Sequence, residues 1–303
     1  MAEACIPVDV FNPGQVFACL GLMEVADVLL GGAEGAFDWG NDADTGFVLA
    51  AQGERNPLLV VLEFLKQAQV YALLPAISPH GDKVRSAKSD KQPIPIELVP
   101  QDMPFPSPDE GAGRLPALLR HTDERGKTHE LRIDYWADPA KMTGRDNVKF
   151  WAGSNGYPGV ALLMDALNLM DGHWEEAAHD PFNLAVPQSS SFRLDWRRDY
   201  VPLDTGFSLN KHDYIITTGY PLVEILAAIG LSHARPRPNS KLAYDYGIIG
   251  MPDGEKVLYP PLFLRAALGC AALPFPHRRF RMELGWPGRE GQARCIINVH
   301  EEN

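Results

Sequence analysis

The segment from Gln15 to Leu30 is apolar on nearly every side of the helix that its sequence predicts. Asn12 and Pro13 precede it in the order typical of a helix N-cap and first helical position, and glycines at 31 and 32 would end it. Such a helix has no polar face for water, so it must lie inside a core that other elements cover. With 303 residues, the chain can bury such a helix in one large domain or in two smaller ones.

Two acidic residues, Glu24 and Asp27, interrupt this apolar stretch, and no apolar run reaches the ~20 residues that a membrane-spanning helix needs. The first ten residues carry only acidic charges, unlike the basic start of a signal peptide. We therefore expect a cytoplasmic protein with no membrane partner. The four cysteines lack any C-x-x-C spacing and are expected to be buried reduced thiols: Cys5, Cys19, Cys270 and Cys295.

The first hundred residues predict an α+β fold, in the order strand, helix, strand, strand, helix, strand. This order is that of a ferredoxin-like or RNA-recognition-motif domain. A Pro- and Gly-rich stretch at 100–116 is the best linker candidate, which gives a first region at 1–116. The six expected elements are the strand Cys5–Val10, the helix Gln15–Leu30, the strands Gly35–Trp39 and Gly46–Ala51, the helix Leu58–Tyr71 and the strand Ile94–Val99.

Residues 117–303 predict a second α+β region, which could also be continuous with the first. Apolar alternation indicates strands at His129–Trp136, Phe192–Trp196 and Lys241–Ile249. Helices are expected at Pro158–Met170, Tyr220–Leu231 and, less regularly, Pro261–Leu273. The segments Phe280–Trp286 and Ala293–His300 flank two glycine-containing turns, so the chain should end in a β-hairpin.

Charge is distributed unevenly along the sequence. The net charge is −11, and an isolated duplex-binding domain would instead have a pI above ~9. Acidic side chains dominate residues 1–66 and 151–230, whereas basic and acidic side chains balance at 67–150 and basic ones prevail after residue 231. Contact with nucleic acid would therefore use local basic patches, while other subunits supply most of the phosphate contacts.

Three basic features are candidate nucleic-acid contacts. The loop 79–92 is expected to be exposed, and it contains Lys83, Arg85, Lys88 and Lys91. Lys149 precedes a glycine-bearing segment, 151–159, that could hold a phosphate before a helix or could be an ordinary tight turn. The densest cluster is Arg278, Arg279 and Arg281, of which the last two would share one face of a strand. The alternative for this cluster is a solvated edge strand that uses charge against aggregation.

Catalytic and metal-binding motifs are missing from the sequence. No nucleophile elbow, phosphate-binding P-loop, dinucleotide fingerprint or zinc-protease helix is found. His173 and His179 flank two glutamates, but their spacing matches no helical ligand pair, so an exposed acidic turn is the better interpretation. We therefore expect no cofactor, no bound metal and no catalytic residue.

Six segments together form a recognisable pattern. The most specific is the N-terminal motif from Val8 to Leu22. The looser ones are His129–Trp136, Lys149–Gly153, Phe192–Trp196, Asp204–Ser208 and Tyr220–Glu224, so the pattern spans most of the chain. These segments resemble a CRISPR-associated family specific to subtype I-U, also named I-G. The resemblance implies an effector-complex subunit, either a large-subunit-like protein or a divergent member of the repeat-associated mysterious protein superfamily. That superfamily uses ferredoxin-like folds.

The sequence therefore suggests a non-catalytic subunit of a type I, Cascade-type RNA-guided complex in antiviral defence. Its expected partners are CRISPR guide RNA, target DNA and other CRISPR-associated subunits, with sequence recognition delegated to base pairing. Two alternatives remain. One is a metal-independent RNA endonuclease with His277 as general base beside Arg278 and Arg279. The other is a protein–protein adaptor that contacts no nucleic acid.

Overall fold

The computed structural model describes residues 1–41, 43–76, 94–103, 115–133, 148, 150, 159–198, 217–253, 255–286 and 294–302. Its helices are α1 (Pro13–Leu30), α2 (Pro57–Gln67), α3 (Gly159–Leu169), α4 (Trp174–His179), α5 (Pro221–His233), α6 (Pro261–Leu268) and a short 3₁₀ turn, Trp196–Arg198. Its strands are β1 (Ala2–Pro7), β2 (Glu34–Asp38), β3 (Gly46–Ala51), β4 (Gln69–Pro75), β5 (Ile96–Val99), β6 (Ala117–Thr122), β7 (Thr128–Ile133), β8 (Val186–Pro187), β9 (Thr218–Gly219), β10 (Arg237–Ser240), β11 (Ala243–Met251), β12 (His277–Gly285) and β13 (Cys295–Glu302).

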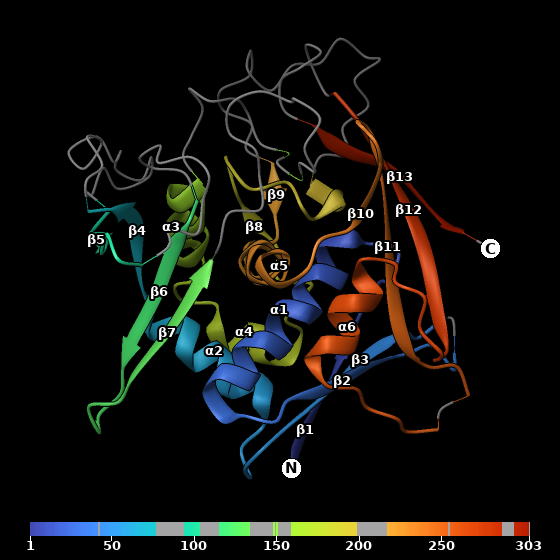
Figure 1. Cartoon of the computed structure of the whole chain (residues 1–303), viewed down its shortest axis with the longest axis horizontal. Coiled ribbons are helices and arrows are strands. Elements are labelled where there is room, and N and C mark those ends of the chain that lie inside the picture. The colour runs from blue at the N-terminus through green and yellow to red at the C-terminus, as the bar shows by residue number, and fades with distance from the viewer. Residues whose placement is uncertain are drawn as a thin grey trace.

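Two large sheets enclose a helical core, which confirms the mixed α+β class. The larger sheet runs β1-β3-β2-β11-β12-β13, with β10 added beside β11. The smaller sheet runs β5-β4-β6-β7, and β8 pairs with β9 separately. The helices α1, α5 and α6 lie between the two large sheets (Figure 1). Buried apolar side chains from both ends of the chain and from its middle form one main core.

The apolar helix α1 lies at the centre of this core, as its sequence predicts. Every residue from Pro13 to Ala26 is buried. The Asn12 side-chain oxygen accepts a hydrogen bond from the Gly14 amide at 3.1 Å, and Gly31 ends the helix with a φ of 79°. In the described part of the chain, α1 alone is long and apolar enough to span a membrane by composition, and 78% of it is buried inside the protein.

The predicted ferredoxin-like core is not confirmed. β1, α1 and β2 form a split β-α-β unit in which β3 lies between the two strands and is antiparallel to both. The predicted second helix ends four residues early, at Gln67, because Gln69–Pro75 forms β4 instead. β4 pairs with β5 and β6 in the smaller sheet, and no described strand pairs with the outer edge of β1.

Strand pairing crosses the predicted boundary at residue 116. β2 pairs in parallel with β11, so residues from both ends of the chain share the larger sheet. β6, which begins at Ala117, pairs with β4 from the other side of the boundary. The predicted loop 79–92, and most of the predicted linker 100–116, lie outside the described residues.

The C-terminal hairpin is confirmed, since β12 and β13 are antiparallel neighbours with Arg281 opposite His300. The predicted strand at Phe192–Trp196 is wrong. Residues 192–195 have no regular structure, and Arg193 has a φ of 67°, which an extended strand does not allow. The polar residues of this segment do not face solvent as in a strand. Asp195 is fully buried, and its side chain and backbone are hydrogen-bonded inside the protein.

Candidate nucleic-acid interface

The basic cluster lies on β12, between β11 and β13. Phe280, Met282 and Leu284 are buried, and the arginines at the alternate positions are only partly buried. Arg279 therefore shares a face with Arg281, as predicted. Each of them has a directly paired neighbour on both sides of β12. Because β12 is flanked by two strands, the alternative of a solvated edge strand is wrong.

Arg281 is held by carboxylates on this face. Asp245 is 2% exposed and accepts from the Arg281 Nε at 2.8 Å and from the Arg237 Nη2 at 2.7 Å. A second carboxylate, that of Glu302, lies 3.1 Å from the Arg281 Nη1. Burial opposes ionisation of Asp245, but the hydrogen bonds from the two arginines prevail and hold its pKa below the usual value. Most of the charge of Arg281 is thus compensated within the protein.

Arg278 is compensated in the same way on the other side of the strand. Its Nε and Nη2 bind the two carboxylate oxygens of Glu301 at 2.8 and 2.6 Å. Hydrogen bonding by Arg278 lowers the pKa of Glu301, so this pair stays ionised near neutral pH. A bidentate pair of this kind fixes the guanidinium but leaves it little net attraction for a phosphate.

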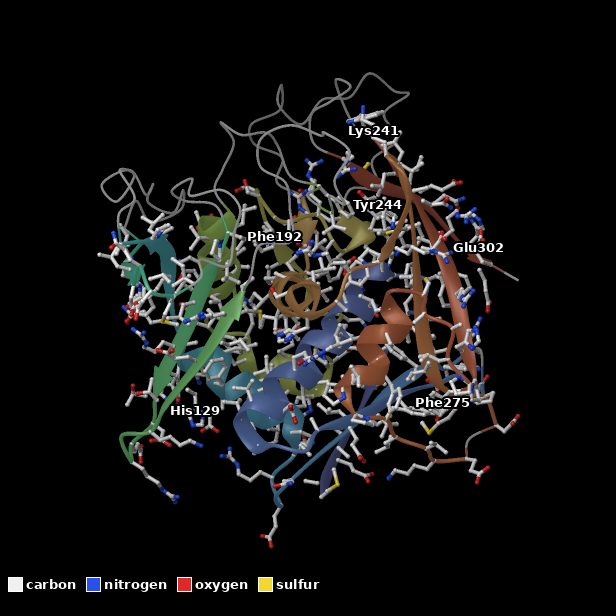
Figure 2. The ribbon with its side chains drawn as sticks, viewed as in Figure 1. His129, Phe192, Lys241, Tyr244, Phe275 and Glu302 are labelled. Carbon is white, nitrogen blue, oxygen red and sulfur yellow. The ribbon has the colours of Figure 1, made fainter. Side chains whose placement is uncertain are left out.

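Arg279 differs from its two neighbours. No salt bridge joins its guanidinium to any carboxylate among the described residues, although Glu302 is its cross-strand partner on β13. Its Nε is buried without a hydrogen-bond partner. Of the three predicted arginines, Arg279 is therefore the one for which the described residues provide no carboxylate partner. Figure 2 shows Glu302 on this sheet, across the molecule from His129 of the smaller sheet.

The other predicted contacts, Lys83, Arg85, Lys88, Lys91 and Lys149, lie outside the described residues. The sequence reasoning missed Arg237, which the structure places beside Arg281 through the pairing of β10 with β11. The basic segment Arg235-Pro-Arg237-Pro could have indicated this residue in the sequence. Only the strand register shows that Arg237 and Arg281 both bind Asp245.

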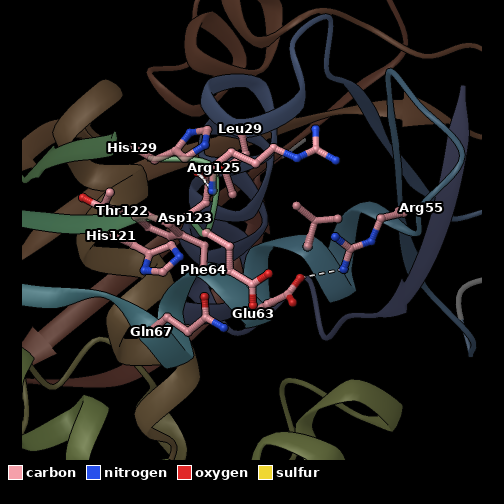
Figure 3. A pocket seen from close by; sticks show the side chains of 12 residues that line it. Leu29, Arg55, Glu63, Phe64, Gln67, His121, Thr122, Asp123, Arg125 and His129 are labelled. Atoms are coloured by element: carbon pink, nitrogen blue, oxygen red, sulfur yellow. Dashed lines mark hydrogen bonds and ion pairs between the residues drawn. The ribbon is translucent and has the colours of Figure 1, made fainter. Parts of the chain in front are cut away.

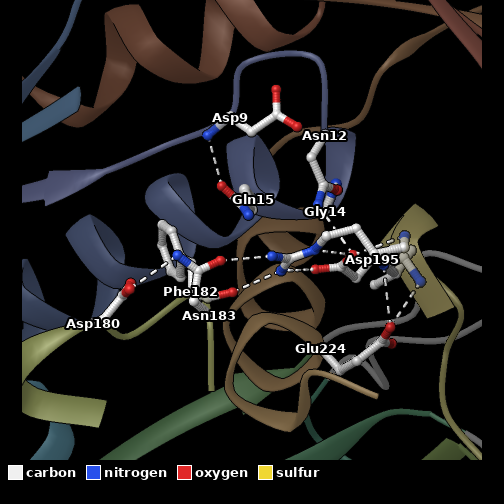
Figure 4. A network of polar contacts seen from close by, with 11 residues as sticks. Asp9, Asn12, Gly14, Gln15, Asp180, Phe182, Asn183, Asp195 and Glu224 are labelled. Carbon is white, nitrogen blue, oxygen red and sulfur yellow. Dashed lines mark hydrogen bonds and ion pairs between the residues drawn. The ribbon is translucent and has the colours of Figure 1, made fainter. Parts of the chain in front are cut away.

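A second polar site lies at the start of α1, where Asn12, Asp195 and Glu224 are all fully buried. The Asn12 Nδ2 donates to the Asp195 Oδ1 at 3.0 Å (Figure 4). One oxygen of Glu224, on α5, accepts from the backbone amides of Leu194 and Asp195 at 3.0 and 3.1 Å. These contacts hold residues 192–195 in their irregular path between two helices.

Arg197 completes this network with a bidentate ion pair to Asp195, at 2.9 Å from Nε and 2.6 Å from Nη2. Its remaining donors bind the Asn183 side chain at 2.8 Å and the Phe182 carbonyl at 2.6 Å. The guanidinium also stacks on Tyr220, with its carbon 3.5 Å from the ring centroid. Nearly every donor of Arg197 is used, so this network is a structural clamp, which we call the Asp195 clamp.

The histidines considered in the sequence lie apart. His173 is 3.3 Å from Glu176 on α4, and the described residues contain no group of three or more side chains arranged to hold a metal ion. His277 begins β12 and its Nδ1 lies 2.9 Å from the Phe275 carbonyl oxygen. His277 therefore lies next to Arg278, as the endonuclease alternative requires. One nitrogen of its imidazole ring is already in a hydrogen bond with the backbone.

We compared the chain with known protein families, curated proteins and solved structures. No protein-family model, no curated protein and no solved structure matches the chain.

Proposed function

We propose that the protein is a non-catalytic subunit of a type I CRISPR surveillance complex. In this proposal it contacts the backbone of guide RNA or target DNA and docks against neighbouring subunits in the cytoplasm. The split β-α-β unit of β1, α1, β3 and β2 would be its remnant of a ferredoxin-like domain. Base pairing between guide and target would provide sequence recognition. The chain itself would need only a surface that fits the nucleic-acid backbone and a few positively charged side chains.

The observation that best supports this proposal is the Asp195 clamp. The three segments of the family resemblance that hold it, Val8–Leu22, Phe192–Trp196 and Tyr220–Glu224, are far apart in sequence but meet there through buried hydrogen bonds. Their contact gives these three segments one structural role, which would explain why they occur together if the chain is a member of the CRISPR-associated family.

The contact with nucleic acid would depend on Arg279. Strand β12 fixes the backbone of Arg279 before any ligand arrives, so binding a phosphate costs little ordering entropy. One cation on a protein of net charge −11 is a weak site by itself. This weakness favours a subunit that adds its contact within a larger assembly, where other chains provide the positive field.

Purification from the native host tests the proposal. The tagged chain should retain other CRISPR-associated proteins together with short RNA that carries repeat-derived ends. In the same purification, Arg279→Ala should keep the proteins but bind RNA with a salt dependence shallower by about one contact, a log–log slope change of roughly 0.7. Lys256→Ala is the matched control, because it removes an exposed cation that is paired with Glu3 on a different part of the sheet.

Recovery of no CRISPR-associated protein and no such RNA would overturn the proposal. Two other results would favour the alternatives. Cleavage of RNA by the isolated chain, lost in His277→Ala, would favour the endonuclease. A complex whose RNA affinity is the same with and without Arg279 would favour the adaptor.

A further inference from the structure

A cavity of about 480 Å³ separates α2 from the hairpin of β6 and β7, on the opposite side of the molecule from β12. Its floor is apolar, with Leu29 from α1 and Val60 and Phe64 from α2 (Figure 3). Phe64 is 4% exposed and anchors this floor in the main core. A cavity of this volume is large enough for a small organic group such as a nucleobase.

Two histidines form one wall of the cavity. His121 and His129 are direct partners in the β6–β7 ladder, so their side chains project from the same face of the hairpin. That face carries the pairs Ala117–Ile133 and Leu119–Leu131, which are buried in the core. The histidines therefore continue the core-facing row beyond the point where the core ends, and both line the open cavity.

The remaining lining is polar, and part of it is already engaged. Arg55 is paired with Glu63 at 2.6 Å. The Asp123 carboxylate accepts the backbone amides of Arg125 and Lys127 at 3.0 and 2.8 Å within its own turn. The hydrogen bond from Lys127 is the main cause of the lowered pKa of Asp123, which therefore stays ionised.

Besides the two histidines, three polar groups in the described lining remain to recognise a ligand: the guanidinium of Arg125, the exposed carboxylate of Glu124 and the amide of Gln67. An amide can pair with a base edge as both donor and acceptor. Together with imidazole rings above an apolar floor, it suits a flat heterocycle better than an isolated anion. Unpaired bases bind proteins by this kind of stacking, with hydrogen bonds to the base edge and a cation near the phosphate.

We propose that this cavity, the His121–His129 pocket, receives one unpaired nucleobase of an RNA or DNA strand. The inference extends the proposed function to a second contact, since a guide or displaced strand supplies unpaired bases. The carboxylates of Glu63, Asp123 and Glu124 and the guanidinium groups of Arg55 and Arg125 also line this pocket.

The test uses the isolated full-length chain and fluorescein-labelled pentanucleotides of RNA and of DNA, followed by anisotropy at low salt. Val60→Trp fills the floor without changing charge, and the double variant His121→Ala/His129→Ala removes the wall. Each should weaken binding by at least about fivefold, as expected for the loss of one stacked base. His179→Ala, an exposed histidine on α4, is the control and should bind like the wild type. Circular dichroism melting of each variant establishes that it is folded.

Equal binding by folded Val60→Trp and wild type, or no binding by the wild type, overturns the pocket proposal. A loss seen with RNA alone or with DNA alone supports it and identifies the strand. A second measurement separates the pocket proposal from the subunit proposal. Tagged Val60→Trp is purified from the native host, and its retention of CRISPR-associated proteins is compared with that of the wild type. A variant that assembles normally but has unchanged oligonucleotide affinity contradicts the pocket and leaves the subunit role standing.

Discussion

Replacing Gly21 or Gly230 with alanine is expected to destabilise the protein by about 3 kcal/mol, near the upper end for an overpacked core. α1 and α5 cross with their backbones in direct contact at these two glycines. A Cβ on Gly21 would overlap the Leu226 carbonyl oxygen, and one on Gly230 would overlap the Phe17 carbonyl oxygen. Because both obstacles are helix backbone, no side-chain rotation can relieve them, and the two helices would have to move apart.

Thermal and urea unfolding measure this effect, with Gly269→Ala as the matched control. Gly269 follows α6, and a Cβ there would make only ordinary contacts of 3.6 Å or more. The control should change the free energy of unfolding by less than about 1 kcal/mol. If Gly21→Ala and Gly269→Ala unfold alike, the backbones of α1 and α5 do not cross in close contact.

Asp195→Ala should destabilise the protein by about 3 kcal/mol, the cost of leaving one partner of a buried ion pair without the other. The change removes the two side-chain hydrogen bonds and the backbone hydrogen bond from Arg197, and it removes the acceptor of Asn12, which is fully buried. The side chain of Arg197 keeps 24% of its surface exposed and can recruit water, which limits the loss to the lower end of the usual range.

Asp253→Ala is the control for this substitution, because Asp253 is an exposed aspartate in the turn after β11. It should unfold within about 0.5 kcal/mol of the wild type. The double variant Asp195→Ala/Arg197→Ala provides a further check. If Arg197 acts mainly through Asp195, the double variant should lose little more than Asp195→Ala. Additive losses would mean that Arg197 stabilises the protein independently of the clamp.

Local signals predicted much of the fold. The sequence around Asn12-Pro13-Gly14 carries its own capping chemistry, so the start of α1 was correct to within two residues. The glycines expected to form turns near residue 290 likewise predicted the β12–β13 pairing. The strands that pair with β4 could not be predicted from local signals. The pairing of β4 with β5 and β6 depends on contacts between distant segments, which apolar periodicity in one segment does not encode.

The sequence predicted where the arginines of β12 lie, but it did not predict which of them have carboxylate partners. The alternation in Arg278-Arg279-Phe280-Arg281 placed two arginines on one strand face. The pairing of Arg281 with Asp245 and Glu302, and of Arg278 with Glu301, depends on strand register, which the sequence does not show. The error at residues 192–196 has a similar origin, since Asp195 was read as the polar side of a strand and is in fact fully buried in an ion pair.

RNA affinity of the lone chain, compared with that of the purified complex near physiological salt, tests whether other subunits provide most of the positive field. Arg279 on β12 and the base pocket would add to that field, because the chain itself has a net charge of −11. Filter binding should therefore show weak binding by the lone chain and tight binding by the complex. Nanomolar binding of guide RNA by the lone chain, or no binding by a complex that contains it, would contradict the account.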